Sequence, residues 1–295
     1  MSHILEIQNL SKNYGSVKAV ENLSLSVQKG QIFGLLGPNG SGKTTTLGTV
    51  LGVTAQDTGT FNWFGQSPSK QLRQKIGAIL ESPNFYPYLS AHDNLKIAAR
   101  IKKVGSQEIE RVLKTVGLYE RQHSNFKTFS LGMKQRLAVG SALLGDPEVL
   151  VLDEPTNGLD PQGIAEMRQL IINLGKSGKT IIIASHLLDE IEKVCSHVAV
   201  LKNGKLLASG PVHDILGSTE QYEVASENLE MLRVLLNDYP LIKNIKPLIQ
   251  IFLIEVDDAF RPADLNKFLF ERGIVLSHLQ QKKHSLEAQF LELTS

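Results

Sequence analysis

The order of apolar and polar residues along the chain predicts strands that alternate with helices. Every second residue is apolar over 23–27, as in a half-buried strand, and residues 31–36 form an apolar run that suits a buried parallel strand. Apolar residues then recur at helical spacing over 47–51. Two more strand-sized apolar runs cover 149–152 and 180–185. This alternation predicts an α/β fold with a mostly parallel core sheet.

The middle of the chain has a different pattern. From about residue 89 to residue 146 the apolar residues follow helical periods and β-branched runs are few, which predicts a helical subdomain. Residues 198–208 instead predict a β-hairpin, because Asn203-Gly204 lies between two apolar stretches and favours a tight turn.

The pattern changes again after residue 217, and we expect a domain boundary there, between residues 1–217 and residues 218–295. The second part is predicted to contain strands at 222–224, 251–256 and 273–276, and helices at 229–236 and 263–271. This order is compatible with a small accessory α+β domain of split β-α-β type.

Residues 37–44, the phosphate loop, read Gly-Pro-Asn-Gly-Ser-Gly-Lys-Thr and fit the pattern G-x-x-x-x-G-K-[ST]. The glycines let backbone N–H groups approach a phosphate chain, Lys43 places a charge at the β- and γ-phosphates, and the Thr44 hydroxyl can bind Mg²⁺. The predicted strand before the loop and the helix after it are the context that this motif needs. The sequence therefore predicts a nucleotide site rather than an incidental glycine-rich turn.

Polar groups follow directly on two other apolar strands. Asp153 and Glu154 follow one of them, and His186 follows the other. In parallel sheets ligands bind outside the carboxyl ends of the strands, so we expect these groups and the phosphate loop to meet in one crevice. There Asp153 can hold Mg²⁺ opposite Thr44, and Glu154 can polarise an attacking water.

Composition and charge narrow the choice of partners. The chain has 295 residues, 31 basic and 30 acidic side chains and a formal net charge of +1, so nucleic acid is not an expected partner. With the single cysteine Cys195 no internal disulfide is possible, which fits a reducing compartment. Residues 1–7 do not resemble a secretion signal, and no apolar run is long enough to cross a bilayer. We therefore expect any membrane role to come through a partner chain.

Taken together, the motifs resemble those of the ATP-binding cassette (ABC) ATPases over roughly residues 3–217. After the phosphate loop come, in the family's order, a signature segment at 129–136 (Phe-Ser-Leu-Gly-Met-Lys-Gln-Arg), the strand that ends on Asp153 and Glu154, the loop at 157–160, and His186. One such motif alone is weak, but the ordered set is specific. The resemblance implies the P-loop nucleotide-hydrolase fold.

The resemblance also implies roles for the matching residues. Lys43, Glu154 and His186 are expected to be catalytic, with Glu154 as the general base or water-orienting carboxylate and His186 in contact with the γ-phosphate. Tyr14 is expected to stack on adenine, and Val20 to supply a neighbouring apolar contact. The residues expected to bind ATP are Tyr14, Val20, Gly37, Pro38, Asn39, Gly40, Ser41, Gly42, Lys43, Thr44 and Thr45.

The resemblance also implies which residues contact Mg²⁺ and a second subunit. Mg²⁺ is expected on Thr44, Asp153 and Glu81. The helix that Ser130 caps is expected to direct its positive end at the γ-phosphate held by a second subunit. The residues expected to contact ATP across that interface are Ser130, Gly132, Met133 and Asp160. The implied assembly is a head-to-tail homodimer with two ATP molecules in its interface.

Three positions depart from the family's commonest pattern. In the signature segment Leu131 is found where Gly is commonest, and Met133 where Gln is frequent. How these replacements alter the contact between the two subunits is left open. Glu81 stands at a strand end where Gln is usual; it can still bind Mg²⁺, but it adds negative charge near the γ-phosphate. These features are similar to transporters of the bacitracin-resistance and lantibiotic-immunity type. The chain end 285–294 is also similar, although an amphipathic helix that closes the accessory domain is the simpler interpretation.

The function that the resemblance implies is an ATP-hydrolysing subunit that drives a separate membrane permease. It is expected to be cytoplasmic, peripheral on the inner face of the cell membrane, and to export a peptide, antibiotic or lipid-like compound. A soluble ABC-type ATPase of DNA repair or translation would usually need coiled-coil insertions or two cassettes. A non-catalytic, nucleotide-gated scaffold is disfavoured by intact Lys43, Glu154 and His186. The sequence fixes neither cargo nor direction, and gliding-motility and other bacterial export systems stay open.

Overall fold

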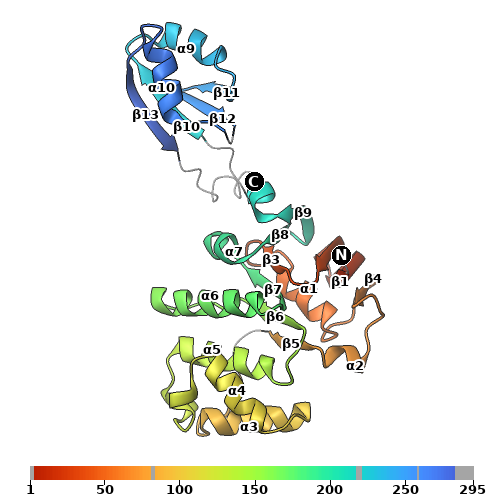
Figure 1. The fold of residues 1–295 in the computed structure, drawn as a ribbon. Helices are drawn as coiled ribbons and strands as arrows, with labels where there is room; N and C mark the ends of the chain where they lie inside the picture. The colour runs from red at the N-terminus through yellow and green to blue at the C-terminus, as the bar shows by residue number, and fades with distance from the viewer. Residues whose placement is uncertain (1–2, 81–83, 217–220, 258, 283–295) are drawn as a thin grey trace. The chain divides into compact units, whose positions relative to one another are not determined.

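A computed structural model describes residues 3–80, 84–216, 221–257 and 259–282. The chain divides into two compact units, Met1–Ile215 and Leu216–Ser295 (Figure 1). None of the helices in the described residues combines the length and the apolar character needed to cross a bilayer.

A six-stranded sheet forms the centre of the first unit, in the order β5-β6-β7-β3-β8-β9. The strands β5, β6, β7, β3 and β8 are parallel, and β9 is antiparallel to β8. Every residue of β6 and β7 is buried, which is why both read as unbroken apolar runs. The parallel α/β core is therefore confirmed. The strand bounds are β3 Ile32–Leu36, β5 Ile76–Ile79, β6 Val149–Asp153, β7 Thr180–Ser185, β8 His197–Lys202 and β9 Lys205–Pro211.

A three-stranded antiparallel sheet, in the order β2-β1-β4, shares a hydrophobic core with the large sheet and with helix α1 (Lys43–Val50). Its strands are β1 (His3–Tyr14), β2 (Val17–Gln28) and β4 (Thr58–Trp63). Trp63 joins the layers, since its buried indole N–H donates a 2.7 Å hydrogen bond to the carbonyl of Val50 at the end of α1. The alternation at 23–27 correctly predicted part of β2.

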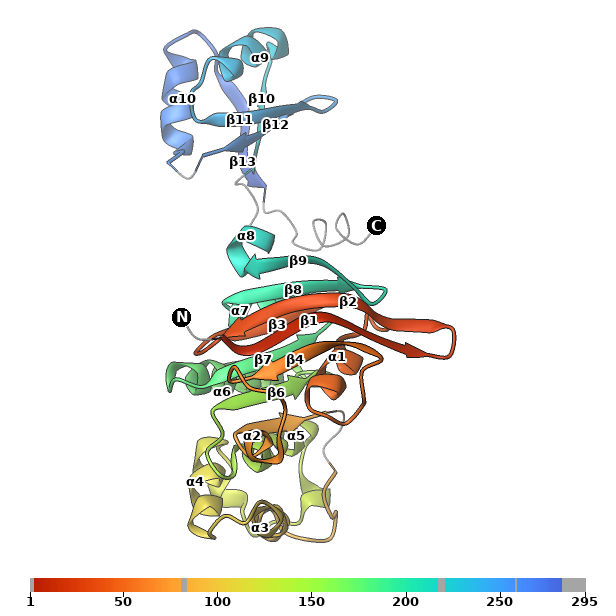
Figure 2. The ribbon, with the colours of Figure 1, turned by 90° about the vertical axis from the view of Figure 1, so that its right-hand side faces the viewer.

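Helices α3 (Ala91–Lys102), α4 (Gln107–Thr115) and α5 (Leu131–Leu143) form the predicted helical region and lie together in Figure 2. Ser90 caps α3 and Ser130 caps α5, each with a side-chain oxygen that accepts a backbone N–H. The other helices of this unit are α2 (Lys70–Arg73), α6 (Pro161–Lys176), α7 (Leu188–Val194) and α8 (Val212–Leu216).

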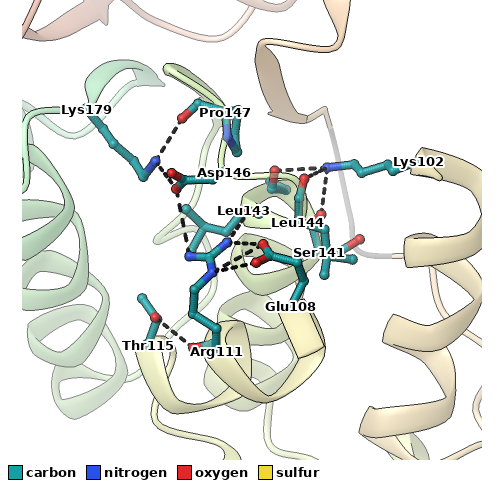
Figure 3. Close-up of polar contacts among 11 residues, drawn as sticks. Lys102, Glu108, Arg111, Thr115, Ser141, Leu143, Leu144, Asp146, Pro147 and Lys179 are labelled. Atoms are coloured by element: carbon teal, nitrogen blue, oxygen red, sulfur yellow. Dashed lines mark hydrogen bonds and ion pairs between the residues drawn. The ribbon is translucent and has the colours of Figure 1, made fainter. Parts of the chain in front are cut away.

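A polar network at the end of α5 ties the helical region together and to the α/β core (Figure 3). The ammonium group of Lys102 donates to the carbonyls of Ser141, Ala142 and Leu144 at 2.8, 2.9 and 3.2 Å, where the partial negative charge of the helix end favours a cation. Burial of the side chain lowers the pKa of Lys102 to about 8. This network replaces the missing intrahelical partners of the last carbonyls of α5.

Asp146 extends the network across two layers. Its carboxylate lies 3.8 Å from Arg111 of α4 and 2.8 Å from Lys179, which directly precedes β7. Hydrogen bonding to Lys179 holds the pKa of Asp146 below its usual value.

The predicted hairpin at 198–208 is confirmed. Asn203 and Gly204 have φ of 49° and 79°, the paired positive values that a two-residue turn of this type requires, and Lys202 pairs with Lys205. The turn also contacts the phosphate loop, because the Gly204 N–H donates to the carbonyl of Ser41 at 3.1 Å.

The second unit has the order β10-α9-β11-β12-α10-β13, with strands arranged β11-β12-β10-β13 and every neighbouring pair antiparallel. This is the split β-α-β arrangement compatible with the sequence. The bounds are β10 Gln221–Ser226, α9 Leu229–Asn237, β11 Ile242–Pro247, β12 Phe252–Val256, α10 Pro262–Phe270 and β13 Leu276–Lys282.

Two details of this unit differ from the sequence-based prediction. The strand expected at 273–276 is wrong, since β13 begins only at Leu276 and Gly273 has a φ of 82°. The strand β11 was not predicted, because none of its residues is fully buried and its half-buried Ile242 and Ile245 are separated by exposed polar residues, as expected at the edge of a sheet.

Candidate functional site

The phosphate loop connects the end of β3 to the start of α1, as the motif requires. A Cβ on Gly37 would lie 2.3 Å from the carbonyl oxygen of Leu201, and one on Gly42 would lie 2.4 Å from that of Ala19. Gly40 faces open space but has a φ of 80°. The loop is thus pressed against two neighbouring segments at Gly37 and Gly42, and it turns through a left-handed conformation at Gly40.

The cation and the hydroxyl of the loop are both engaged. The side chain of Lys43 is 5% exposed, and its ammonium group donates to the carbonyls of Gly37 and Pro38 at 2.8 and 3.2 Å. The Thr44 hydroxyl donates to the carboxylate of Asp153 at 2.8 Å. Lys43 is therefore held over the loop itself, which is where the phosphate chain of a nucleotide is bound in this motif.

The side chains expected at the strand ends do meet. Since β6, β7 and β3 are neighbours in the sheet, their carboxyl ends bring Glu154, His186 and Lys43 together. One carboxylate oxygen of Glu154 lies 2.9 Å from Nδ1 of His186, and the other lies 3.5 Å from Nζ of Lys43. The carboxylate thus bridges an imidazole and an ammonium group at the edge of the phosphate loop.

The backbone of Glu154 adopts an uncommon conformation, with a φ of 48°. Its N–H donates to the carbonyl of Ala184 on β7 at 2.9 Å, which fixes the turn that follows β6. A positive φ in a non-glycine residue is tolerated where the surrounding structure determines it, as at many active sites.

The side-chain oxygens beside the phosphate loop suit a hard divalent cation that is also bound by the phosphates of a nucleotide. Thr44 and Asp153 offer two oxygens, and the described residues contain no group of three or more His, Cys, Asp or Glu side chains placed to bind a metal. Mg²⁺ usually keeps several waters and binds through one or two protein oxygens together with phosphates. The residues present therefore fit Mg²⁺ bound jointly with a nucleotide.

The two residues expected to contact adenine, Tyr14 and Val20, lie in different environments. Tyr14 ends β1 and is 51% exposed, and the Lys12 ammonium group lies over its ring, 5.5 Å from the centroid. Val20 is 1% exposed and packs in the shared core of the two sheets, which does not fit the expected contact with a base. The neighbouring Ala19 is only partly buried, and its backbone carbonyl approaches Gly42 of the phosphate loop.

A bulge in β2 explains why Val20 faces the core, whereas the resemblance placed it near the base. Between Leu10 and Lys12 the pairing of β1 with β2 shifts register, and Asn22 has a φ of 52°. The bulge reverses which residues of β2 face inward, so the simple alternation at 23–27 does not continue to Ala19 and Val20.

The residues expected to contact a second subunit's nucleotide lie at two helix starts. Ser130 caps α5 and accepts the N–H of Met133 at 3.3 Å, and Asp160 caps α6 and accepts the N–H of Gly163 at 2.9 Å. Within the described part of the chain no hydrogen bond or ion pair connects Ser130, Met133 or Asp160 to the phosphate loop of the same chain. Two expected features, Glu81 and the chain end 285–294, lie outside the described residues.

Comparisons with known proteins agree with this geometry. A family model described as ABC transporter matches residues 20–157. The bacitracin transport ATP-binding protein BcrA of Bacillus licheniformis is 38% identical over 305 residues, which cover 99% of this chain and 98% of that protein. The lantibiotic transport ATP-binding protein SrtF of Streptococcus pyogenes is 38% identical over 229 residues, which cover 78% of this chain and 95% of that protein.

A solved structure supports the fold as well. The structure of cbiO1 from Clostridium perfringens, described as part of the ABC transporter complex cbiONQ, matches with a TM-score of 0.68 and 28% identity. The match covers 74% of this chain and 92% of that chain.

Proposed function

Because this chain belongs to the ABC transporter ATP-binding proteins, and is therefore an ATPase subunit coupled to transport, we propose that it powers export of a peptide, antibiotic or lipid-like compound. Two relatives are named for transport of bacitracin and of a lantibiotic, and the first aligns with nearly the whole chain. This similarity supports a cargo of that kind.

One observation carries the assignment of catalytic residues. Glu154 lies between His186 and Lys43 at the ends of adjacent strands, with its carboxylate oxygens 2.9 and 3.5 Å from the two nitrogens. A carboxylate in this position can accept a proton from water, while the ammonium group and the imidazole can contact the negative γ-phosphate.

Hydrolysis in this site would proceed by attack of water on the γ-phosphorus. Glu154 accepts or orients the proton of the water, the bond from the γ-phosphorus to its bridging oxygen breaks, and ADP keeps that oxygen. Lys43 stabilises the charge on the β- and γ-phosphate oxygens once its bonds to Gly37 and Pro38 are exchanged for them. His186, which is held by Glu154, would report the presence of the γ-phosphate.

The metal would be held by Thr44 and Asp153, whose oxygens are 2.8 Å apart. Mg²⁺ there would neutralise charge on the β- and γ-phosphates. Glu81, which the family resemblance places among the metal ligands, would add a third oxygen.

We also assign a head-to-tail homodimer and a permease partner. Ser130 and Asp160 each cap the start of a helix, where free backbone N–H groups and a partial positive charge favour a phosphate group, and this supports a role toward the nucleotide of a second subunit. The solved relative described as part of an ABC transporter complex supports a membrane partner. The chain would then lie peripherally on the inner face of the cell membrane.

The test is affinity capture of tagged Glu154→Gln protein from native membranes in the presence of ATP, followed by mass spectrometry. The substitution slows hydrolysis, so the complex with ATP accumulates. A stoichiometric multi-span membrane protein is the expected result, and its identity would narrow the cargo. A matched capture with Lys43→Ala, which removes the phosphate-binding cation, controls for contacts that do not depend on ATP.

Recovery of the homodimer alone, or of ribosomes or DNA-associated proteins, would contradict the transport assignment. Accumulation of the cargo inside cells that lack the protein, compared with cells that express it, tests the export direction separately.

A further inference from the structure

Leu131 is the position at which the signature segment departs from the family's usual glycine, and its side chain has a specific contact. It is the first residue of α5, directly after the capping Ser130, and 45% of it is exposed. Its Cδ2 atom lies 3.2 Å from the place where a Cβ on Gly158 would be. Leu131 therefore packs on the 157–160 loop of its own chain, and a glycine there would lack this contact.

The starts of α5 and α6 also approach each other closely. A Cβ on Gly132 would lie 3.7 Å from the Cα of Gly163, so glycine faces glycine where the two helices begin. One turn further along, the guanidinium group of Arg136 lies 3.2 Å from the carboxylate of Glu166. A Cβ on Gly132 would be in ordinary van der Waals contact there, so the two capped helix ends lie side by side.

The 157–160 loop is short, and it connects this contact to the hydrolytic carboxylate. The N–H of Asn157 donates to the carbonyl of Glu154 at 3.1 Å, and Asp160 at the other end of the loop caps α6. Gly158, which Leu131 covers, has a φ of 75° and is the point at which the loop can most easily change its path.

From these contacts we propose that Leu131 is a positioning residue that fixes the 157–160 loop to the start of α5. The residues that meet the partner's nucleotide, Ser130 and Asp160, then move as one body. Closure of the signature segment on the nucleotide of the second subunit would shift the loop in the same chain, and with it the backbone of Glu154. This inference rests on the proposed head-to-tail dimer.

The contact is expected to affect dimer closure and turnover but not the binding of ATP to one subunit. Leu131 is not among the residues proposed to bind the nucleotide of its own chain, so the KM for ATP should be nearly unchanged in Leu131→Ala. Residues in contact commonly show coupling that corresponds to a several-fold change in an equilibrium or rate. We therefore expect kcat to fall by about 3- to 10-fold, and the ATP-dependent dimer to dissociate more easily by a similar factor.

The experiment compares three substitutions. Leu131→Ala removes the contact, Leu131→Met restores an apolar side chain of similar volume, and Leu207→Ala removes a leucine of similar exposure, 41%, on β9. Steady-state ATP hydrolysis gives kcat and KM for each variant. Sedimentation over a range of protein concentrations in ATP, with Glu154→Gln added to each variant, gives the dissociation constant of the dimer.

The proposal requires loss in Leu131→Ala, recovery in Leu131→Met and no change in Leu207→Ala. Unchanged kcat and dimer affinity in Leu131→Ala, equal losses in Leu207→Ala, or no recovery with methionine would overturn it. If the Glu154→Gln parent remained monomeric in ATP, the head-to-tail dimer itself would be refuted, and this inference would fall with it.

Discussion

Glu154 and His186 are hydrogen-bonded through one carboxylate oxygen and Nδ1, at 2.9 Å, although 32 residues separate them in the sequence. The contact exists because β6 and β7 are adjacent parallel strands that end at the same edge of the sheet. The other carboxylate oxygen lies 3.5 Å from Nζ of Lys43. Each of the two carboxylate oxygens of Glu154 is therefore close to a group that is expected to contact phosphate.

The first prediction concerns this carboxylate. Glu154→Gln keeps the shape of the side chain but removes the negative charge and the ability to accept a proton. We expect ATP turnover to fall by about 10²- to 10⁴-fold, the usual contribution of an acid–base group, while ATP binding persists. Phosphate-release assays and binding of a fluorescent ATP analogue measure the two effects. Unchanged turnover would show that another group activates the water.

The second prediction separates steric from conformational demands in the phosphate loop. Gly40 and Gly42 both have positive φ, 80° and 101°, but only a Cβ on Gly42 would meet a neighbour, at 2.4 Å from the Ala19 carbonyl oxygen. We expect Gly40→Ala to lower the free energy of unfolding by about 1–2 kcal/mol, the cost of the left-handed conformation alone. Gly42→Ala should lower it by more than Gly40→Ala.

Urea unfolding of the two alanine variants measures this difference. Equal losses of stability would mean that the loop moves away from Ala19 without cost, and that the close approach has no structural importance.

The third prediction concerns the Lys102 ammonium group at the end of α5, which donates to three helix carbonyls. Burial lowers the pKa of Lys102 from 10.5 to about 8, so between these pH values the unfolded chain binds more protons at this group than the folded chain does. Its contribution to the free energy of unfolding therefore rises with pH across that interval, and its destabilising effect is complete below about pH 8.

Lys102→Met should remove this pH dependence at the expense of three hydrogen bonds to helix carbonyls. The measurement is urea unfolding of wild type and variant at several pH values from 7 to 10.5, since the difference between them cancels groups that titrate in both. Lys96→Met, at an exposed position of the same helix, is the matched control. Parallel pH curves for wild type and Lys102→Met would contradict the prediction.

The fourth prediction tests the unusual carboxylate in the sequence. If Glu81 binds the metal, Glu81→Gln should retain ATP binding but alter the relative activation by Mg²⁺ and Mn²⁺, because a neutral amide is a weaker ligand for a hard cation. Titrations of hydrolysis with each metal compare the two proteins. Superimposable curves for both metals would remove Glu81 from the metal site.

The sequence predicted the parts of the site that depend on a short segment. The phosphate loop is defined within eight residues, and the positions of Asp153, Glu154 and His186 follow from the rule that parallel strands end at one edge. The placement of Val20 was not predictable from alternation, because a bulge at Asn22 changes the register and only the partner strand shows it. The same holds for the packing of Leu131 on Gly158, since the sequence does not show which helix starts are neighbours.

Trp63, the single tryptophan of the chain, donates its indole N–H to the last residue of the helix that begins at Lys43 and Thr44. Its environment is almost dry, with 1% of the side chain exposed. Trp63 is therefore an intrinsic fluorescence probe of this helix. A displacement of the helix on nucleotide binding would change the environment and the emission of one defined tryptophan, without a label and without a background from other indoles.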